Sequence, residues 1–250
     1  MARRDILLDP YNVGAECGAT RSSVVSLPTN AFTAMRSLLA RVENPIIFDG
    51  GAFIGAIAKL FRGLFPTSTV YSFEPCRETF ARLEANVADD PRIRAFNFGL
   101  SDRDGTQPFY LNESPMTNSL LASDDLAILT WGPGLLETQT IDEAQFRTID
   151  SVLLEMNIPR IDLLKLDVQG AEGRVMSGAS GACGRGIIGL VYSEIITQPT
   201  YRGQKRFDKA LAPFYDSGFD LYNCYHGTCT SDGRLRAVDA IFTKTNGEGM

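Results

Sequence analysis

Short apolar runs alternate with helix-patterned segments along most of this 250-residue chain. In the helical segments, apolar side chains recur every three or four residues, as in Ile54, Ile57, Phe61 and Leu64. The runs between them are apolar on both faces, which is typical of parallel strands covered by helices on both sides. The strands predicted in this way cover residues 46–48, 70–73, 93–100, 163–166 and 187–192.

The last two strand-like segments, residues 219–225 and 237–244, have no clear helix between them. A turn at Ser231-Asp232-Gly233 joins them, which predicts an antiparallel hairpin. The sequence therefore predicts an α/β fold, with a mainly parallel twisted sheet, helices on both faces and an antiparallel hairpin at one edge.

The chain divides into an extension and one principal domain. Residues 1–44 are predicted to be an N-terminal extension that is helical over residues 29–42, and residues 45–250 to form the domain. The stretch at about 103–147 is too long for a plain connection. We interpret it as an insertion with a hairpin or lid and a helix, in which Trp131 packs in the core.

Composition narrows the class of protein. Hydrophobic residues make up 44% of the chain, enough for a sizeable core, which argues against a disordered protein. The formal net charge of −6 argues against general binding to nucleic acid. No run approaches the roughly 18 apolar residues of a membrane span, and residues 1–10 lack the apolar core of a signal peptide. The five scattered cysteines do not form a disulfide framework, so we expect an intracellular, cytoplasmic protein.

Acidic residues recur at the carboxyl ends of the predicted strands. Open parallel sheets bind ligands beyond these ends, so acids placed there share one rim. Such acids are Asp49, Glu74, Asp102, Asp167 and Glu194. Together they predict a ligand site at this edge of the sheet.

The first of these acids opens a glycine-rich turn, residues 49–55 (DGGAFIG). Glycines let the backbone pass close to a ligand, and the helix that follows offers free N–H groups. Ala52 stands where the dinucleotide fingerprint has its middle glycine. Glu74, after the second strand, is placed to accept hydrogen bonds from both hydroxyls of a ribose. The turn and Glu74 indicate a nucleoside site, and leave S-adenosylmethionine and NAD both open.

Five spaced motifs resemble the FkbM family of methyltransferases. They are residues 49–55 (DGGAFIG), 73–75 (FEP), 118–120 (NSL), 148–153 (TIDSVL) and 161–172 (IDLLKLDVQGAE). They follow the family's order, and the likeness runs from about residue 45 to residue 194. Two positions differ from the family's pattern: Phe53 replaces an asparagine, and Gln169 stands where glutamate is commoner.

The resemblance implies a Rossmann-like class I methyltransferase fold that binds S-adenosylmethionine. By this likeness, one group of residues holds the methionine moiety and the methyl group, and a second holds the nucleoside. The first group is Asp49, Gly51, Gly55 and Asp167, with Phe53 near the sulfonium; the second is Glu74 for the ribose and Leu100, Ser101 and Asp102 for the adenine.

Methyl transfer to an alcohol needs a group that removes the hydroxyl proton. Asp167 and Glu194 are the best-placed candidates, with Lys165 as an electrostatic helper. His226, the only histidine, is a further candidate base, although its place near a hairpin turn favours the surface over the pocket. Cys224 and Cys229 flank it, but structural zinc usually takes four ligands, so we predict no metal site.

The sequence therefore predicts an S-adenosylmethionine-dependent O-methyltransferase that acts on a hydroxyl of a small molecule, sugar or polyketide-like natural product. The alternatives are an NAD-dependent oxidoreductase and a non-catalytic binding protein that keeps the fold but has Phe53 in its pocket. We expect a small-molecule or glycan acceptor as partner, with neither nucleic acid nor a membrane span. The oligomeric state stays open, a homodimer among the alternatives.

Overall fold

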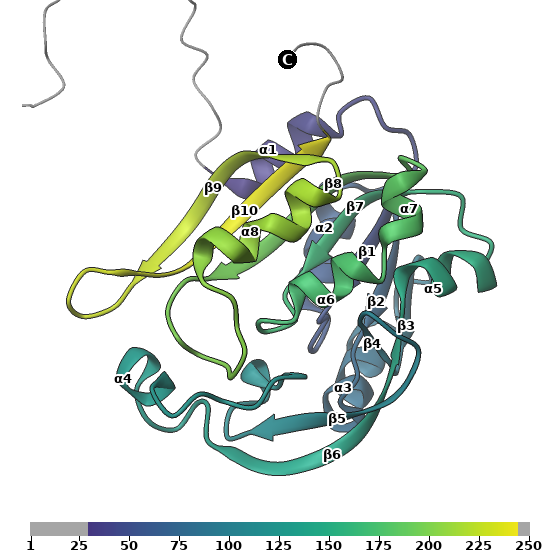
Figure 1. Cartoon of the computed structure of the whole chain (residues 1–250). Coiled ribbons are helices and arrows are strands. Elements are labelled where there is room, and N and C mark those ends of the chain that lie inside the picture. The colour runs from purple at the N-terminus through teal and green to yellow at the C-terminus, as the bar shows by residue number, and fades with distance from the viewer. Residues whose placement is uncertain (1–29, 245–250) are drawn as a thin grey trace, which may run out of the picture.

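A seven-stranded sheet forms the centre of the computed structural model, which describes residues 30–244 (Figure 1). The strand order is β3-β2-β1-β7-β8-β10-β9. The first five strands in that order are parallel, and β10 and β9 form an antiparallel hairpin beside β8. Their bounds are Ile93–Phe96 (β3), Thr69–Phe73 (β2), Ile46–Gly50 (β1), Ile161–Leu166 (β7), Ile188–Ile196 (β8), Leu235–Lys244 (β10) and Phe219–Cys229 (β9). This architecture confirms the predicted fold class.

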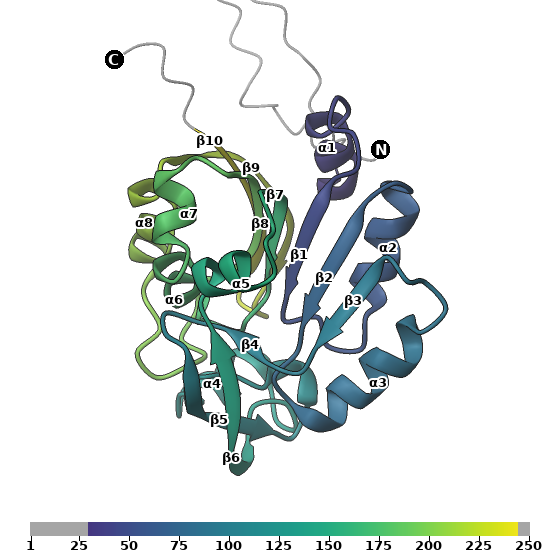
Figure 2. The same cartoon turned by 90° about the vertical axis from the view of Figure 1, so that its right-hand side faces the viewer.

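Helices cover both faces of this sheet (Figure 2). One face carries α1 (Ala31–Leu38), α2 (Ala56–Leu64) and α3 (Arg77–Val87). The other carries α5 (Ile149–Glu155), α6 (Glu172–Ser177), α7 (Ser180–Gly184) and α8 (Phe207–Asp216). Each face has its own apolar core, as expected for strands that are apolar on both sides. No helix within residues 30–244 is long and apolar enough to cross a membrane.

Helix α1 is shorter than the predicted stretch of residues 29–42. It begins after Asn30, whose side-chain oxygen accepts hydrogen bonds from the backbone N–H groups of Phe32 and Thr33. Residues 1–29, the rest of the predicted extension, lie outside the described residues.

The predicted insertion, together with residues 99–100 just before it, contributes a second sheet with the order β4-β6-β5. Its elements are β4 (Gly99–Leu100), β5 (Gly105–Asn112), the 3-10 turn η1 (Pro115–Thr117), α4 (Ala127–Trp131) and β6 (Thr138–Arg147). Figures 1 and 2 show this sheet beyond the carboxyl ends of the parallel strands. The insertion therefore lies over the edge where the sequence predicts a ligand.

The single strand predicted over residues 93–100 is divided between the two sheets. Residues 93–96 form β3, while Gly99 and Leu100 pair with Phe146 and Arg147 of β6. A Cβ atom on Gly99 would lie 2.3 Å from the Phe146 ring, so only glycine permits this close approach. Packing against the insertion thus redirects the chain.

Candidate active site

Strand pairing places polar residues side by side on the sheet face that carries α1 and α2. Asp49 of β1 is paired with Lys165 of β7, which is paired with Tyr192 of β8. One step further along, Glu194 of β8 is paired with Asp239 of β10. Because side chains alternate between the faces of a strand, all five project from the same face.

Lys165 and Asp49 form a buried ion pair at the centre of this row. The Lys165 Nζ lies 3.0 Å from Asp49 Oδ1, and the two side chains are 5% and 0% exposed. Nζ also donates to the carbonyl oxygens of Gly50 and Gly51 and lies 3.9 Å from Asp167 Oδ2. Burial alone would lower the pKa of Lys165, but the carboxylates of Asp49 and Asp167 outweigh it and hold that pKa above its ordinary value. The lysine is therefore a fixed positive charge below the glycine turn.

A cavity of about 340 Å³ lies between the glycine turn and the insertion. Its walls combine a few polar groups with an apolar surface, the usual lining of a small-molecule site. The main sheet and its turns contribute Gly51, Phe53, Glu74, Lys165 and Asp167, and the insertion side contributes Leu100, Phe109, Met116, Asn118 and Phe146.

Five of the nine predicted cofactor residues line this cavity: Gly51, Phe53, Glu74, Leu100 and Asp167. Four others lie outside its lining. Asp49 and Gly55 are the first and last residues of the glycine turn; Asp49 pairs with Lys165, and Gly55 packs on α3. Ser101 is buried, and its backbone N–H donates a hydrogen bond to the Arg147 carbonyl. Asp102 is exposed, and its carboxylate accepts a hydrogen bond from the Ser101 hydroxyl.

The Glu74 carboxylate is held rigidly at the cavity wall. Its oxygens accept from the backbone N–H groups of Phe53 and Cys76 and from the Thr79 hydroxyl. Burial raises the pKa of Glu74 above its ordinary value, against the opposing effect of these hydrogen bonds. The bond from Phe53 connects the acid after β2 directly to the glycine turn.

Three residues of that turn, Gly51, Phe53 and Gly55, adopt left-handed backbone conformations. Phe53 has φ +50°, a region that asparagine tolerates far better than phenylalanine, which gives the family's asparagine a physical reason. Gly51 has φ +72°, and a Cβ atom there would lie 1.9 Å from the Asp167 carbonyl oxygen. The close contact between the β1 and β7 turns therefore needs glycine at residue 51.

Replacing Gly51 with alanine is expected to lower the free energy of unfolding by about 2–4 kcal/mol, the sum of left-handed strain and a steric clash. Gly233→Ala is the matched control, because Gly233 has φ +84° and open space around its Cβ position. In the control, the free energy of unfolding should fall by only about 1 kcal/mol, the cost of the left-handed strain. Chemical denaturation measures both; equal losses would contradict the close contact.

A second cavity, of about 290 Å³, adjoins the first. Both cavities are lined by Ile57, Lys165 and Asp167, so these three side chains stand between them. The other walls of the second cavity are Phe32, Leu166, Tyr192, Glu194, His226 and Asp239. The structure thus brings the four predicted catalytic residues, Asp167, Glu194, Lys165 and His226, around one space.

Gln169 connects two of the acids. Its side-chain amide donates to Asp167 Oδ1 at 2.8 Å and to Glu194 Oε2 at 3.1 Å, while its oxygen accepts from the Tyr201 hydroxyl. A glutamate at this position could not donate to both carboxylates. Burial, together with the nearby charges of Asp167, Glu172 and Asp239, raises the pKa of Glu194 to about 8.

Sequence reasoning missed Asp239, Tyr192 and Phe32. The Asp239 Oδ2 atom accepts from the Tyr192 hydroxyl at 2.7 Å and lies 2.9 Å from His226 Nδ1. A signal for Asp239 was present, since it is a lone acid within the apolar run of β10. Phe32 gave no signal, because α1 packs on the sheet through long-range contacts.

The described residues 30–244 contain no group of three or more metal-ligating side chains arranged to hold an ion. Cys224 and Cys229 are both exposed on β9. Trp131 of the insertion donates from its ring nitrogen to the Thr200 hydroxyl and stacks under Arg236, so it joins the insertion to the main domain.

The chain shares its motifs with a known protein family. The model of the FkbM methyltransferase domain matches residues 49–221, which is more than half of the chain. The chain belongs to the FkbM methyltransferase family. This membership confirms the predicted resemblance, and with it an enzyme that uses S-adenosylmethionine as its methyl donor.

The names of two curated relatives of this FkbM methyltransferase refer to methylation at an oxygen atom. The 2-O-methyltransferase NoeI of Sinorhizobium fredii is 29% identical over 191 residues, covering 71% of this chain and 74% of that protein. The 31-O-demethyl-FK506 methyltransferase FkbM of Streptomyces tacrolimicus is 27% identical over 159 residues, covering 55% of this chain and 60% of that protein. Among solved structures, Aeropyrum pernix fibrillarin in complex with natively bound S-adenosyl-L-methionine has 13% identity and a TM-score of 0.44, covering 83% of this chain and 73% of that one.

The residues of the first cavity fit the cofactor of an FkbM methyltransferase. A rigid carboxylate, Glu74, faces the cavity, and Leu100, Phe109 and Phe146 offer apolar surface for a flat ring. Gly51 contributes its backbone to the wall of the same cavity. The chemistry of these groups matches a molecule with a ribose, an aromatic base and a positively charged sulfur.

Proposed function

We propose that this FkbM methyltransferase transfers a methyl group from S-adenosylmethionine to a hydroxyl of a neutral small molecule, sugar or polyketide-like compound. The observation that carries the proposal is the pair of adjoining cavities separated by Ile57, Lys165 and Asp167. One cavity suits the methyl donor and the other an acceptor. The names of the two relatives, which specify methylation at oxygen, support a hydroxyl acceptor.

In this proposal Glu74 accepts hydrogen bonds from the ribose, and Leu100 packs on the adenine together with Phe109 and Phe146. Gly51 and Asp167 contact the methionine moiety. Asp49 acts indirectly, because its carboxylate pairs with Lys165, which in turn donates to the carbonyl groups of Gly50 and Gly51. Phe53 lies at the cavity wall and leaves the cavity open.

Bound S-adenosylmethionine supplies a methyl group already activated by a sulfonium. The protein aligns the acceptor oxygen with that carbon and excludes water. Such alignment lowers the activation free energy by several kcal/mol. The boundary shared by the cavities is where the two molecules would meet. The Asp167 carboxylate lies at this boundary and would favour a cationic donor on one side.

The charges around the second cavity favour an acceptor that is uncharged near its reacting hydroxyl. Asp167 and Asp239 face this space, and Lys165 is already paired with Asp49. An anionic group such as a phosphate would be repelled there. Phe32 and Tyr192 add aromatic surface that suits the apolar face of a sugar ring or a macrocycle.

The proposal is tested by incubating the protein with S-adenosylmethionine labelled in its methyl group and a panel of acceptors. The panel contains methyl glycosides and cyclohexane-1,2-diol as alcohols, with a glycoside phosphate and cyclohexylamine as controls. We expect label in a methyl ether of a neutral alcohol and little in the phosphorylated compound. Label only in the amine would contradict methylation at oxygen.

A further inference from the structure

A β-bulge in β9 brings His226 toward the second cavity. Ala237 of β10 is paired with Thr228 and Asp239 with Tyr225, so His226 and Gly227 together stand opposite Val238 alone. Such a bulge lets neighbouring side chains lie on the same face of a strand, and bulges recur beside active sites.

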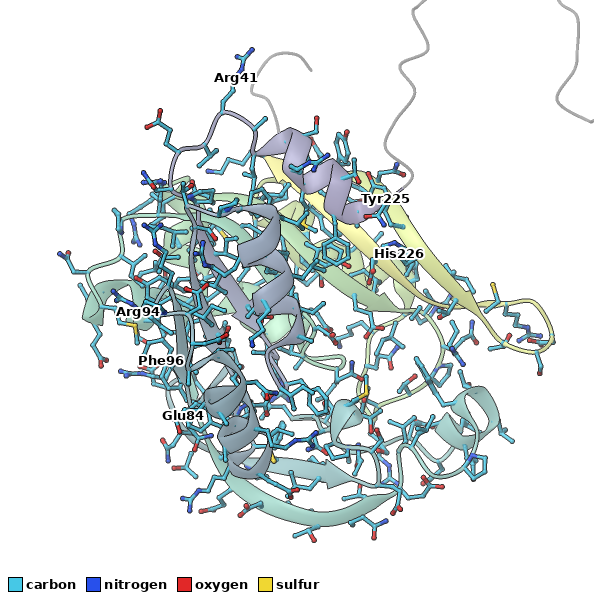
Figure 3. The ribbon with its side chains drawn as sticks, turned by 180° about the vertical axis from the view of Figure 1, so that it is seen from behind. Arg41, Glu84, Arg94, Phe96, Tyr225 and His226 are labelled. Atoms are coloured by element: carbon cyan, nitrogen blue, oxygen red, sulfur yellow. The ribbon has the colours of Figure 1, made fainter. Side chains whose placement is uncertain are left out.

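The conformation of His226 agrees with this geometry. It has φ +49°, an uncommon backbone state for a residue other than glycine. Tyr225 packs in the core on the α1 face, and the His226 ring lies 6.3 Å from the Phe32 ring of α1. Figure 3 shows Tyr225 and His226 together on the hairpin beside α1. The bulge therefore places on the cavity side a histidine that simple alternation would turn away.

Asp239 orients the imidazole. Its Oδ2 atom lies 2.9 Å from His226 Nδ1 and also accepts from the Tyr192 hydroxyl. A carboxylate can only accept hydrogen bonds, so the neutral ring is held with its proton on Nδ1. Nε2 is then free to accept a proton, and the side chain remains 41% exposed at the cavity.

Resting on the proposed function, we propose that His226, positioned by Asp239, is the base that takes the proton from the acceptor hydroxyl. As the oxygen forms its bond to the methyl carbon, the carbon–sulfur bond breaks and its electron pair stays on sulfur. The hydroxyl proton moves to Nε2 of His226, and Asp239 neutralises the resulting imidazolium. The products are a methyl ether, S-adenosylhomocysteine and a protonated histidine.

The other candidates around this space are poorer proton acceptors. Burial and the surrounding carboxylates raise the pKa of Glu194 to about 8, so that group still holds its proton near neutral pH. The Asp167 carboxylate is already engaged, because it accepts a hydrogen bond from Gln169 and lies 3.9 Å from the Lys165 ammonium. The groups that face His226 are Asp239 of β10, Tyr192 and Glu194 of β8, and Lys165 and Asp167 on β7 and the turn after it.

The first test uses the fact that His226 is the only histidine in the chain. Nitrogen-15 NMR of the full chain, purified without a histidine tag and saturated with S-adenosylhomocysteine, reports the tautomer of this one ring. We expect the neutral ring to carry its proton on Nδ1 in the native protein and to lose this bias in Asp239→Asn. A native ring with its proton on Nε2 would overturn the proposal without any acceptor.

The second test measures methyl transfer to the alcohol that the native protein labels best. Because general base catalysis typically contributes about 100-fold to 10,000-fold, His226→Ala should lower kcat by a factor in that range. Added imidazole should restore part of the rate of His226→Ala. It would not do so if His226 had only a structural role. Affinity for S-adenosylhomocysteine should stay within about two-fold of the native value. Cys224→Ser, an exposed position on the same strand, is the matched control and should keep full activity.

The outcomes separate the two proposals. If the native protein labels an alcohol and His226→Ala does so equally well, the base assignment is wrong while the proposed function stands. If the native protein labels no alcohol, the proposed function is wrong, and the tautomer measurement still decides whether Asp239 orients His226 as a base.

Discussion

Lys165→Met is expected to lower the free energy of unfolding by about 3–5 kcal/mol, the usual cost of removing one partner from a buried ion pair. The substitution leaves the fully buried Asp49 carboxylate without its counter-charge. It also removes the donor to the carbonyl groups of Gly50 and Gly51, which shape the glycine turn. Urea denaturation, with S-adenosylhomocysteine absent, measures the loss.

Two further variants sharpen this result. Lys59→Met breaks an exposed ion pair with Asp89, in which the side chains are 48% and 77% exposed, and should change stability by no more than about 1 kcal/mol. The double variant Lys165→Met with Asp49→Asn should regain much of the loss, since no uncompensated charge is then buried. A loss for Lys165→Met as small as for Lys59→Met would contradict the buried pair.

Stability is expected to fall as the pH rises from about 4.5 to about 8, through the titration of Glu194. Its pKa is about 8 in the folded chain and close to 4.3 in an unfolded one. Within this window the folded state keeps a proton that the unfolded state has lost. The stabilisation is therefore complete below the unfolded pKa and disappears as the pH passes the folded one, with a slope of up to about 1.4 kcal/mol per pH unit.

Glu194→Gln should remove the contribution of one titrating proton from the slope of stability against pH. Relative to the native protein, the variant should therefore be more stable at pH 8 than at pH 5. Some slope should remain, because burial also raises the pKa of Glu172 to about 7. Glu143→Gln, at an exposed position of β6, is the control and should keep the native slope. Denaturant midpoints across this pH range report the outcome; identical slopes for the Glu194 and Glu143 variants would contradict it.

The local patterns predicted the main sheet because each strand is short, apolar on both faces and followed by a polar residue. This pattern also located Asp49, Glu74 and Asp167 at one edge. It could not locate the division between β3 and β4, which depends on the packing of Gly99 against Phe146 from a distant strand. Ser101 continues the pairing of β4 with β6 through its hydrogen bond to the Arg147 carbonyl, and neither Ser101 nor Asp102 lines the first cavity.

The second cavity was harder to predict than the first. The bulge at His226 has one sign in the sequence, the glycine that follows it, and a glycine in a strand has several explanations. Asp239 could have been found as an acid within an apolar strand. Its contact with His226 depends on the register of the hairpin. A bulge shifts that register, and the sequence pattern does not show by how much.

The central claim is that the cavity beside Glu74 and the glycine turn binds S-adenosylmethionine, and calorimetric titration tests it most directly. The native protein should bind S-adenosylmethionine and not NAD. Glu74→Gln should bind at least about tenfold more weakly, because a lost hydrogen bond to a charged acceptor costs about 1.5–3 kcal/mol. Glu78→Gln, an exposed position on α3, should bind like the native protein. Binding of NAD alone, or equal affinity in the native protein and Glu74→Gln, would contradict the account.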